Sequence, residues 1–277
     1  MRLHELVVAG DLAGVGQILA KARPPINLQD ARGCTPLSHA CQHGHFEIAK
    51  LLLNAGASPG VLERDNVSLL HHAKTADIAL LLLDCGLDVT GGSCRTSPLE
   101  AACMRDDCGV VEILLDAGAT PSHAALLNAV TRPNMVEALL KAGMEPGGTA
   151  LHFAVHTGVF ETVELLLDAN ADIDHIDVFY SGRRSREETP LHVACRRDRP
   201  LIATLLLERG ADSSLLDGDG YAPLHVAIQK SHTETIKALL MGGVNRYIET
   251  AQGEAPGDLT TAPDIHALLN PPVKRAG

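Results

Sequence analysis

The chain has 277 residues, a formal net charge of −11, and a composition that is 45% hydrophobic but only 3% aromatic. This length allows one large domain or two ordinary ones, and a core of aliphatic residues with few aromatics favours many small helix–helix contacts. The negative charge argues against broad binding to nucleic acid or to an anionic membrane, because both need a basic surface. We therefore expect neither as a partner.

The opening sequence MRLHELVVAGD is interrupted by charges and does not match a signal peptide. The longest aliphatic run, residues 78–83, is far shorter than the roughly 20 residues that span a bilayer. Seven cysteines without a CxxC pair favour a reducing compartment over a disulfide framework. We expect a soluble intracellular protein, cytoplasmic or nuclear, and a monomer.

From the N-terminus onwards, one pattern of two short helices recurs. The step from Leu37 to Leu70 is 33 residues, and the step from Leu191 to Leu224 is again 33, so the period is 33. Weaker copies lie at 3–22, 68–88, 97–120 and 123–145. The clearest copies align without a gap and are TPLSHACQHGHFEIAKLLLNAGAS (35–58), TALHFAVHTGVFETVELLLDANAD (149–172), TPLHVACRRDRPLIATLLLERGAD (189–212) and APLHVAIQKSHTETIKALLMGGVN (222–245).

Each part of the pattern has a physical reason. Thr35 and Thr189 can cap a helix through their hydroxyl groups, and the proline after each lies at the first helical position, where a missing N–H costs nothing. Aliphatic runs such as 51–53 bury the second helix, and Gly56 can end it in the left-handed conformation. One unit alone leaves apolar faces uncovered, so stability must come from stacking.

These motifs resemble the ankyrin repeat family, whose signature is T-P-L-H-x-A followed by a second helix that ends in L-L-x-x-G-A-D. The resemblance covers almost the whole chain. It implies an all-α fold class, an ankyrin-repeat solenoid of about eight helix-turn-helix repeats plus a C-terminal cap. We expect a single domain over 1–270 and a flexible tail over 271–277. The expected repeats lie near 1–33, 34–66, 67–95, 96–121, 122–147, 148–187, 188–220 and 221–252, with the cap at 253–270.

Two copies are shorter than the rest. From Ala73 to Gly86 there are 13 residues, and from Ala129 to Gly143 there are 14, against 16 in the full copies. The missing residues lie between the two helices, so we expect abbreviated helices and irregular stacking there. The fifth copy also lacks Thr-Pro-Leu-His and has HAALLNAV instead.

One copy is longer than the rest. The step from Leu151 to Leu191 is 40 residues, seven over the period, and the excess lies in VFYSGRRSREE, between Asp177 and Thr189. The ankyrin resemblance implies that this linker is the β-hairpin finger of the fold, here an extended finger loop between repeats six and seven. It also implies that the loop borders the concave surface with which family members hold partners.

The same region gathers positive charge. Residues 178–200 hold six arginines and three acids, a formal +3, so the other 254 residues carry −14. We expect the arginines of 196–199 near the base of the finger, and Arg, Tyr and Phe are the residue types that dominate interface hot spots. The alternative is a solvated loop whose arginines pair with Glu187, Glu188 and Asp198. The partner-binding candidates are Phe179, Tyr180, Arg183, Arg184, Arg186, Arg196, Arg197 and Arg199.

Three histidines of the Thr-Pro-Leu-His motif are expected to form hydrogen bonds between adjacent turns. They are His152, His192 and His225. No serine, cysteine or lysine lies in a recognisable nucleophile motif. We therefore expect no catalytic residue and no cofactor.

Two other clusters suggest a metal site but do not fit one well. The segment 171–177 holds Asp172, Asp174, His175 and Asp177, with Asp217 and Asp219 one repeat later, yet acids recur at such turns for local hydrogen bonding. The segment 34–45, CTPLSHACQHGH, holds two cysteines and three histidines, but no spacing in it matches a zinc signature. We expect no metal.

The leading hypothesis is a non-catalytic protein–protein interaction module that binds an acidic or phosphorylated segment of a protein partner on its concave face. One alternative is an enzyme, in which the acids and histidine of 172–177 hold a metal or exchange protons while Arg183 and Arg197 hold an anionic small substrate. The other is an adaptor subunit that recruits a substrate to a larger complex.

Overall fold

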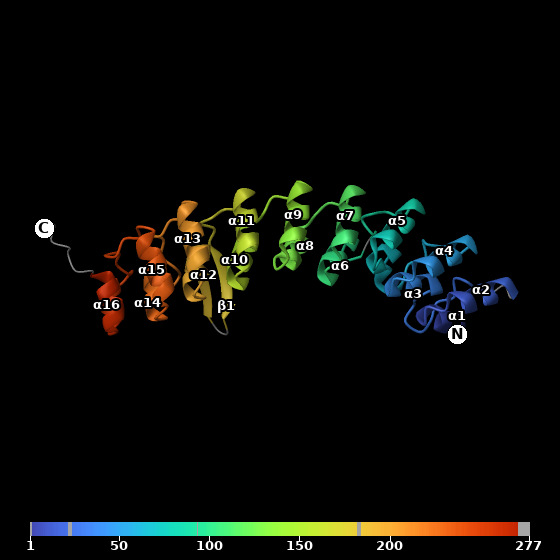
Figure 1. The fold of residues 1–277 in the computed structure, drawn as a ribbon, viewed down its shortest axis with the longest axis horizontal. Helices are drawn as coiled ribbons and strands as arrows, with labels where there is room; N and C mark the ends of the chain where they lie inside the picture. Colours follow the sequence, from blue (N-terminus) through green and yellow to red (C-terminus); the bar gives the residue numbers. More distant parts are fainter. Residues whose placement is uncertain (1, 22–23, 93, 182–183, 271–277) are drawn as a thin grey trace. The chain divides into compact units, whose positions relative to one another are not determined.

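A computed structural model describes residues 2–21, 24–92, 94–181 and 184–270, and the side chains of 2, 65 and 179–186 lie outside this description. The chain forms two compact units, Met1–Ala129 with Glu137–Met144, and Val130–Val136 with Glu145–Gly277. Figure 1 labels the helices of both. The single domain expected over 1–270 stays a prediction. Short helices, packed in pairs, make up most of both units, which confirms the predicted helical repeat fold.

The first unit contains helix pairs from the first part of the chain. Their bounds are α1 Arg2–Val8, α2 Leu12–Lys21, α3 Pro36–His43, α4 Phe46–Asn54, the 3-10 turns η1 Arg64–Asn66 and η2 Leu69–His72, α5 Ala76–Asp84, α6 Pro98–Arg105, α7 Cys108–Asp116 and α8 His123–Ala129. Helix α9, Pro133–Lys141, contributes residues to both units.

The second unit contains three full helix pairs, a hairpin and a closing pair. Their bounds are α10 Gly148–Thr157, α11 Phe160–Asp168, β1 Asp177–Ser181, β2 Arg184–Glu188, α12 Pro190–Arg196, α13 Pro200–Glu208, α14 Pro223–Gln229, α15 Thr233–Met241, η3 Pro256–Leu259 and α16 Pro263–Leu269. Helix α12 packs between α10 and α14, and α13 packs between α11 and α15, so the first and second helices form two layers.

The predicted helix starts are confirmed. The hydroxyl of Thr35 accepts from the backbone N–H of Ser38 at 3.1 Å, while the N–H of Thr35 donates to the Ser38 hydroxyl, also at 3.1 Å. At the other start, the N–H of Thr189 donates to Nδ1 of His192 at 3.3 Å, and the Thr189 hydroxyl lies 2.8 Å from the same nitrogen. A proline follows each threonine at the start of the helix, where its missing N–H is not needed.

The core consists of the residues that the repeat pattern makes small or aliphatic. The alanine that recurs in the first-helix pattern is fully buried, as are Leu52, Leu114 and Leu166 of the second helices. Small residues let neighbouring first helices approach closely, while the leucines fill the space between the layers. The fully buried alanines are Ala40, Ala73, Ala102, Ala154, Ala194 and Ala227.

The short third copy is abbreviated where the sequence predicts. Its first helix is reduced to the single 3-10 turn η2, and the second, α5, is of normal length. The next repeat completes the end of η2, since Arg105 donates to the carbonyl oxygens of His71 at 2.6 Å and of Ala73 at 3.0 Å. These bonds satisfy carbonyl groups that a longer helix would have bonded internally.

Completion of a first helix by the following repeat recurs in the second unit. Arg199 donates to the carbonyl oxygen of Thr157, the last residue of α10, at 3.3 Å. His232 lies with its Nδ1 2.8 Å from the carbonyl oxygen of Cys195, near the end of α12. A donor placed at the C-terminal end of a helix satisfies its free carbonyls, and a positive charge there also interacts well with the helix dipole.

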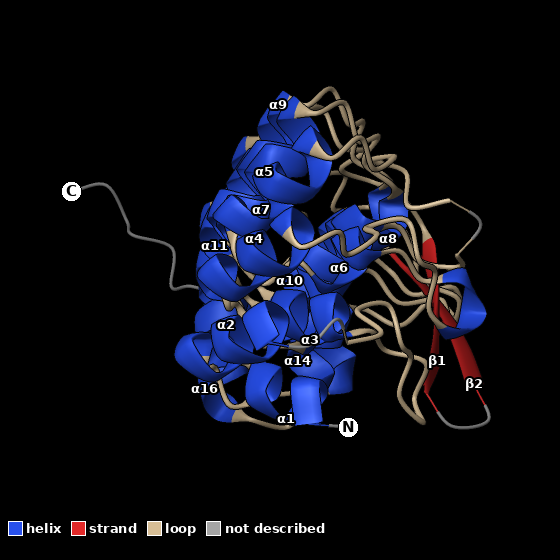
Figure 2. Ribbon diagram, turned by 90° about the vertical axis from the view of Figure 1, so that its right-hand side faces the viewer, coloured by secondary structure: helices blue, strands red, loops and turns tan. Residues whose placement is uncertain are grey.

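The segment between repeats six and seven is a two-stranded antiparallel hairpin, in which Asp177 pairs with Glu188 and Val178 with Glu187. The strands, red in Figure 2, lie at one side of the helices, where β1 contacts α10 and β2 contacts α12. The fold class expected from the sequence is all-α, although the ankyrin resemblance implies a β-hairpin finger at this linker. Pairing is reasonable, because Val, Phe and Tyr suit extended backbone and a glycine follows them.

Candidate partner-binding site

The base of the hairpin is fixed on both sides by backbone hydrogen bonds. The Nε2 atom of His152, on α10, donates to the carbonyl oxygen of Glu188 at 2.7 Å. On the other side, the N–H of Gly218 donates to the carbonyl oxygen of Glu187 at 3.0 Å. The hairpin is thereby tied both to the preceding first helix and to the loop of the following repeat.

A buried group of three charges lies under the same base. An Nη2 atom of Arg196 lies 2.5 Å from the Glu188 carboxylate and 3.3 Å from that of Asp217. The side chains of Glu188 and Asp217 are only 4% and 2% exposed, and that of Arg196 is 18% exposed. The second oxygen of Asp217 accepts from the N–H of Tyr221 at 2.9 Å, so the carboxylate is held on both sides.

This arrangement determines whether Arg196 can add positive charge to the surface. Its side chain points back along α12 toward the helix start, as helical side chains do, and so reaches the hairpin base. Two carboxylates surround one guanidinium, hence Arg196 contributes no net positive charge to the surface. For this arginine, the contacts match the alternative in which local acids neutralise the loop.

Arg197 and Arg199 lie elsewhere. Arg197 donates to Nε2 of His156, and Arg199 donates to the carbonyl oxygen of Thr157. The guanidinium of Arg199 covers Gly158, where an added Cβ would come within 2.4 Å of its Cζ atom. Burial and these two arginines lower the pKa of His156.

The arginines expected together at the finger base are therefore divided. The side chain of Arg196 reaches back to the hairpin base, whereas the side chains of Arg197 and Arg199 contact His156 and Thr157 at the end of α10. The remaining predicted residues are in the hairpin itself. The backbones of Phe179, Tyr180, Arg184 and Arg186 belong to the strands, with Phe179 paired to Arg186, while Arg183 lies outside the described residues.

Exposed apolar residues around the hairpin were not among the predicted site residues. Ile176 is 52% exposed, and Val178 and Leu216 are each 41% exposed. Val178 is the register partner of Glu187, and Leu216 is two residues before Gly218, which bonds Glu187 from the other side. The alternation of Ile176 and Val178 in the sequence was the available signal. Such residues can supply apolar contact beside charged ones.

The acids of 171–177 are used by the turns that carry them. The carboxylate of Asp172 accepts from the N–H of Asp174 at 3.2 Å, and that of Asp174 accepts from the N–H of Asp212 at 2.9 Å. Burial raises the pKa of Asp174. His175 packs against Gly148 at the start of α10. Among the described residues, this set does not form a group of three possible metal ligands.

Two histidines of the Thr-Pro-Leu-His motif, His152 and His192, join neighbouring repeats, as predicted. In addition to the bond of His152 to Glu188, Nε2 of His192 donates to the carbonyl oxygen of Tyr221 at 2.9 Å. The Nδ1 atom of His192 accepts from the N–H of Thr189 at 3.3 Å, which fixes the proton of the neutral ring on Nε2. His225 likewise accepts from the N–H of Ala222 at 3.1 Å, within its own repeat, and its buried Nε2 atom has no hydrogen-bond partner.

Acidification is expected to destabilise the second unit. Burial lowers the pKa values of His192 and His225 in the folded state, although the carboxylate of Asp217 opposes the effect. The unfolded chain, with histidine pKa values near 6.5, therefore binds more protons, so this stability is present above about pH 6.5 and is lost as the pH falls through the folded values. Urea unfolding at about pH 7.5 and about pH 5.5 measures the difference.

Two variants test whether the buried histidines cause this pH dependence. His192→Gln should weaken it, because glutamine can serve the same cap without titrating. His123→Gln, at an exposed position of the first unit, should leave it unchanged. An identical pH dependence in all three proteins would contradict the assignment to the buried histidines.

A family model described as ankyrin repeats, in three copies, matches residues 3–93, 99–177 and 177–249. Among curated relatives, the chain is 26% identical over 257 residues to the B-cell lymphoma 3 protein homolog of Mus musculus, covering 92% of the chain and 46% of the relative. It is 31% identical over 211 residues to ankyrin repeat and SOCS box protein 16 of Homo sapiens, covering 72% and 42%.

A third relative is the E3 ubiquitin-protein ligase KEG of Arabidopsis thaliana, 28% identical over 227 residues, covering 69% of the chain and 13% of the relative. The crystal structure of the ankyrin repeat domain of Bcl-3 aligns over 97% of both chains, with 24% identity and a TM-score of 0.43. The chain thus spans less than half the length of these curated relatives, between 13% and 46%.

No helix within the described part of the chain combines the length and the apolar character needed to cross a bilayer. The family match itself extends from residue 3 to residue 249 with one short gap. It agrees with the paired helices, with the Thr-Pro-Leu-His caps and with the histidines that join one repeat to the next. The chain therefore belongs to the ankyrin repeat family.

Proposed function

We propose that the hairpin of 177–188, together with the adjoining ends of α10 and α12, is the partner-binding surface of a non-catalytic protein–protein interaction module. Ankyrin repeat proteins generally act as such modules. The observation that carries the proposal is the buried contact of Arg196 with Glu188 and Asp217, which fixes the hairpin base. A pre-organised element loses less conformational entropy on binding.

The partner segment is proposed to be acidic or phosphorylated. The local formal charge of +3 over 178–200 stands against −14 for the other 254 residues, so an anionic segment is attracted here and repelled elsewhere. Arg183, Arg184 and Arg186 are the proposed charged contacts, since Arg196 is already neutralised. Phe179 and Tyr180 are the proposed apolar anchors, with Ile176 and Val178 beside them.

Charge reversal tests this surface. Arg183→Glu combined with Arg184→Glu is expected to reduce capture of the partner from native cell extract at least tenfold, because both attraction and hydrogen-bond donors are lost. The matched control, Lys74→Glu with Arg95→Glu, makes the same charge change at exposed positions of the first unit and should retain the partner. Equal capture by all three proteins would remove the hairpin arginines from the surface.

The enzyme alternative has weaker support in the site geometry, because the carboxylates of Asp172 and Asp174 already accept backbone hydrogen bonds. Turnover that is lost on Asp174→Ala would favour it. The adaptor alternative draws on the names of two relatives, an E3 ubiquitin-protein ligase and a SOCS box protein. A cytoplasmic or nuclear location and a monomeric state are part of the same proposal, which cell fractionation and analytical ultracentrifugation would test.

A further inference from the structure

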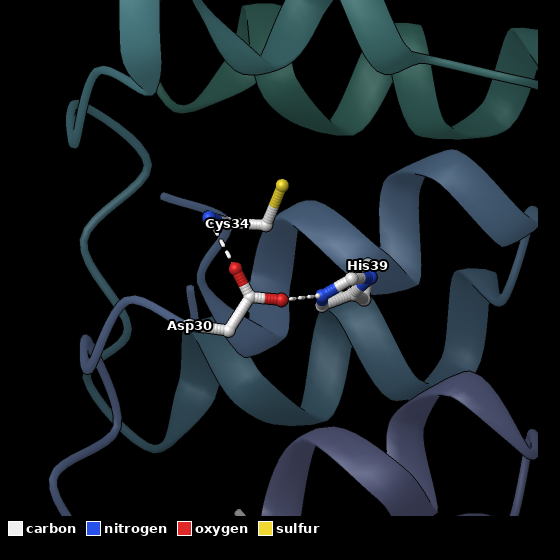
Figure 3. Close-up of side chains that lie close together, drawn as sticks. All are labelled: Asp30, Cys34 and His39. Carbon is white, nitrogen blue, oxygen red and sulfur yellow. Dashed lines mark hydrogen bonds and ion pairs between the residues drawn. The ribbon is translucent and has the colours of Figure 1, made fainter. Parts of the chain in front are cut away.

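Three side chains with different metal-binding atoms lie close together in the first unit. Asp30 and Cys34 belong to the loop before α3, and His39 belongs to α3 itself (Figure 3). Their candidate ligand atoms, one oxygen, one sulfur and one nitrogen, all lie within 4.8 Å of one another. The closest pair is Oδ2 of Asp30 and Nε2 of His39, at 2.8 Å.

The Asp30 carboxylate is oriented by the loop. Its Oδ1 atom accepts from the N–H of Arg32 at 2.8 Å and from the N–H of Cys34 at 3.0 Å. This leaves Oδ2 directed at the imidazole. Outer hydrogen bonds of this kind hold carboxylate ligands in metal sites. Gln42 makes a comparable contact with the sulfur, its Nε2 lying 3.7 Å from Sγ of Cys34.

The group is buried but reachable. The side chain of His39 is 10% exposed and the residue Cys34 is 7% exposed, whereas the side chain of Asp30 is 28% exposed and opens one side to solvent. The Nδ1 atom of His39 is buried without a hydrogen-bond partner.

A fourth candidate ligand comes from the next repeat. The side chain of Glu63 is only 7% exposed, and one oxygen accepts from His72 at 2.8 Å. The other oxygen, Oε1, is buried and has no hydrogen-bond partner. The Glu63 carboxylate interacts with the Cys34 thiol and also with the Ser38 hydroxyl. Its oxygens are not among the three ligand atoms that lie within 4.8 Å of one another, so the side chain would have to move to complete a site around the thiol.

We propose that Asp30, Cys34 and His39, with Glu63 as fourth ligand, bind one zinc ion. Zinc takes four ligands in a tetrahedron, and it accepts thiolate, imidazole and carboxylate in one site. Bond lengths of about 2.0–2.3 Å require ligand atoms somewhat more than 3 Å apart, so the Asp30–His39 hydrogen bond opens by roughly half an ångström when the ion enters. The ion would join the loop before α3 to the loop of the following repeat.

The sequence pattern did not indicate this site for a physical reason. Zinc signatures are recognised by pairs of ligands at short fixed spacing, and here the ligands come from one loop, one helix face and a second repeat. Asp30 lies before the cysteine- and histidine-rich segment 34–45, and Glu63 lies well after it. Only folding brings them together.

Cobalt(II) is the probe for the test. Full-length protein, freed of metal, is titrated with Co²⁺ and then with Zn²⁺. We expect one equivalent of Co²⁺ to bind with a thiolate-to-metal band in the near ultraviolet and with strong tetrahedral bands in the visible, both removed by Zn²⁺. Cys34→Ser and Asp30→Asn, which keep side-chain size, should lose the thiolate band or bind at least tenfold more weakly. Glu63→Gln should also weaken binding.

Matched controls separate this site from adventitious binding. Cys85→Ser and Cys108→Ser remove exposed thiols of the same unit and should leave the spectrum unchanged. Zn²⁺ should raise the thermal unfolding midpoint of the unaltered protein and of these two controls, but not of Cys34→Ser or His39→Gln. No thiolate band in the unaltered protein, a band that survives Cys34→Ser, or a band lost in a control would each overturn the proposal.

Discussion

Replacing Arg196 with methionine is expected to lower the free energy of unfolding of the second unit by about 3 to 5 kcal/mol. Glu188 and Asp217 are almost fully buried and would each lose the only cation that an ion pair gives them in the described chain. Removing one partner of a buried charge group leaves an uncompensated charge, which costs far more than an exposed ion pair contributes. Urea unfolding followed by circular dichroism measures the change.

Two further proteins identify the source of this loss. Arg197→Met removes an exposed arginine of the same helix end and should change stability by less than about 0.5 kcal/mol. Arg196→Met combined with Glu188→Gln and Asp217→Asn should recover most of the stability, since no buried charge is then unpaired. A single Arg196→Met substitution that costs less than about 1 kcal/mol would show that the group is solvated.

Replacing Leu82 with alanine is expected to cost the first unit about 3 kcal/mol, within the range of about 2 to 5 kcal/mol for buried leucines. Leu82 lies on α5 and has no exposed surface. The repeat to which it belongs has only the short turn η2 as its first helix, so few neighbours can move to fill the cavity. Chemical denaturation with a probe in the first unit gives the value.

An exposed leucine on the same helix supplies the control. Leu80, on the same helix, is 45% exposed, and Leu80→Ala should cost well under 1 kcal/mol. The two substitutions remove the same atoms from the same helix and keep the same helix propensity. Equal costs for both would mean that α5 does not pack on the face that the structure gives it.

Features that depend on near neighbours in the chain could be predicted from the sequence. The caps at Thr35 and Thr189, the buried alanines and the shortened third copy each follow from residues within a few positions of one another. The bond from His192 to Tyr221 could also be anticipated, because it repeats with the period of the chain. Periodic and local sequence patterns were therefore sufficient to predict the fold.

Features that depend on the identity of distant partners could not be predicted. The six arginines of 178–200 look alike in sequence, yet Arg196 is neutralised by Asp217, 21 residues away, while Arg199 completes a helix that ended more than 40 residues earlier. In the same way, the run of leucines at 80–83 does not show which of them is buried until the phase of α5 is fixed. Charge counting located the basic region but not its contacts.

Arg105, Arg199 and His232 each donate a hydrogen bond to the repeat that precedes them in the chain. These contacts between repeats therefore all run in one direction. In each case, carbonyl groups at the end of a first helix lack these hydrogen-bond donors until the next repeat has folded onto it. On a ribosome, the repeat that has just emerged is therefore unfinished at one end, and its successor completes it. A protein shortened from its C-terminus would carry a frayed last helix unless the cut also left an amino acid able to donate to those carbonyls.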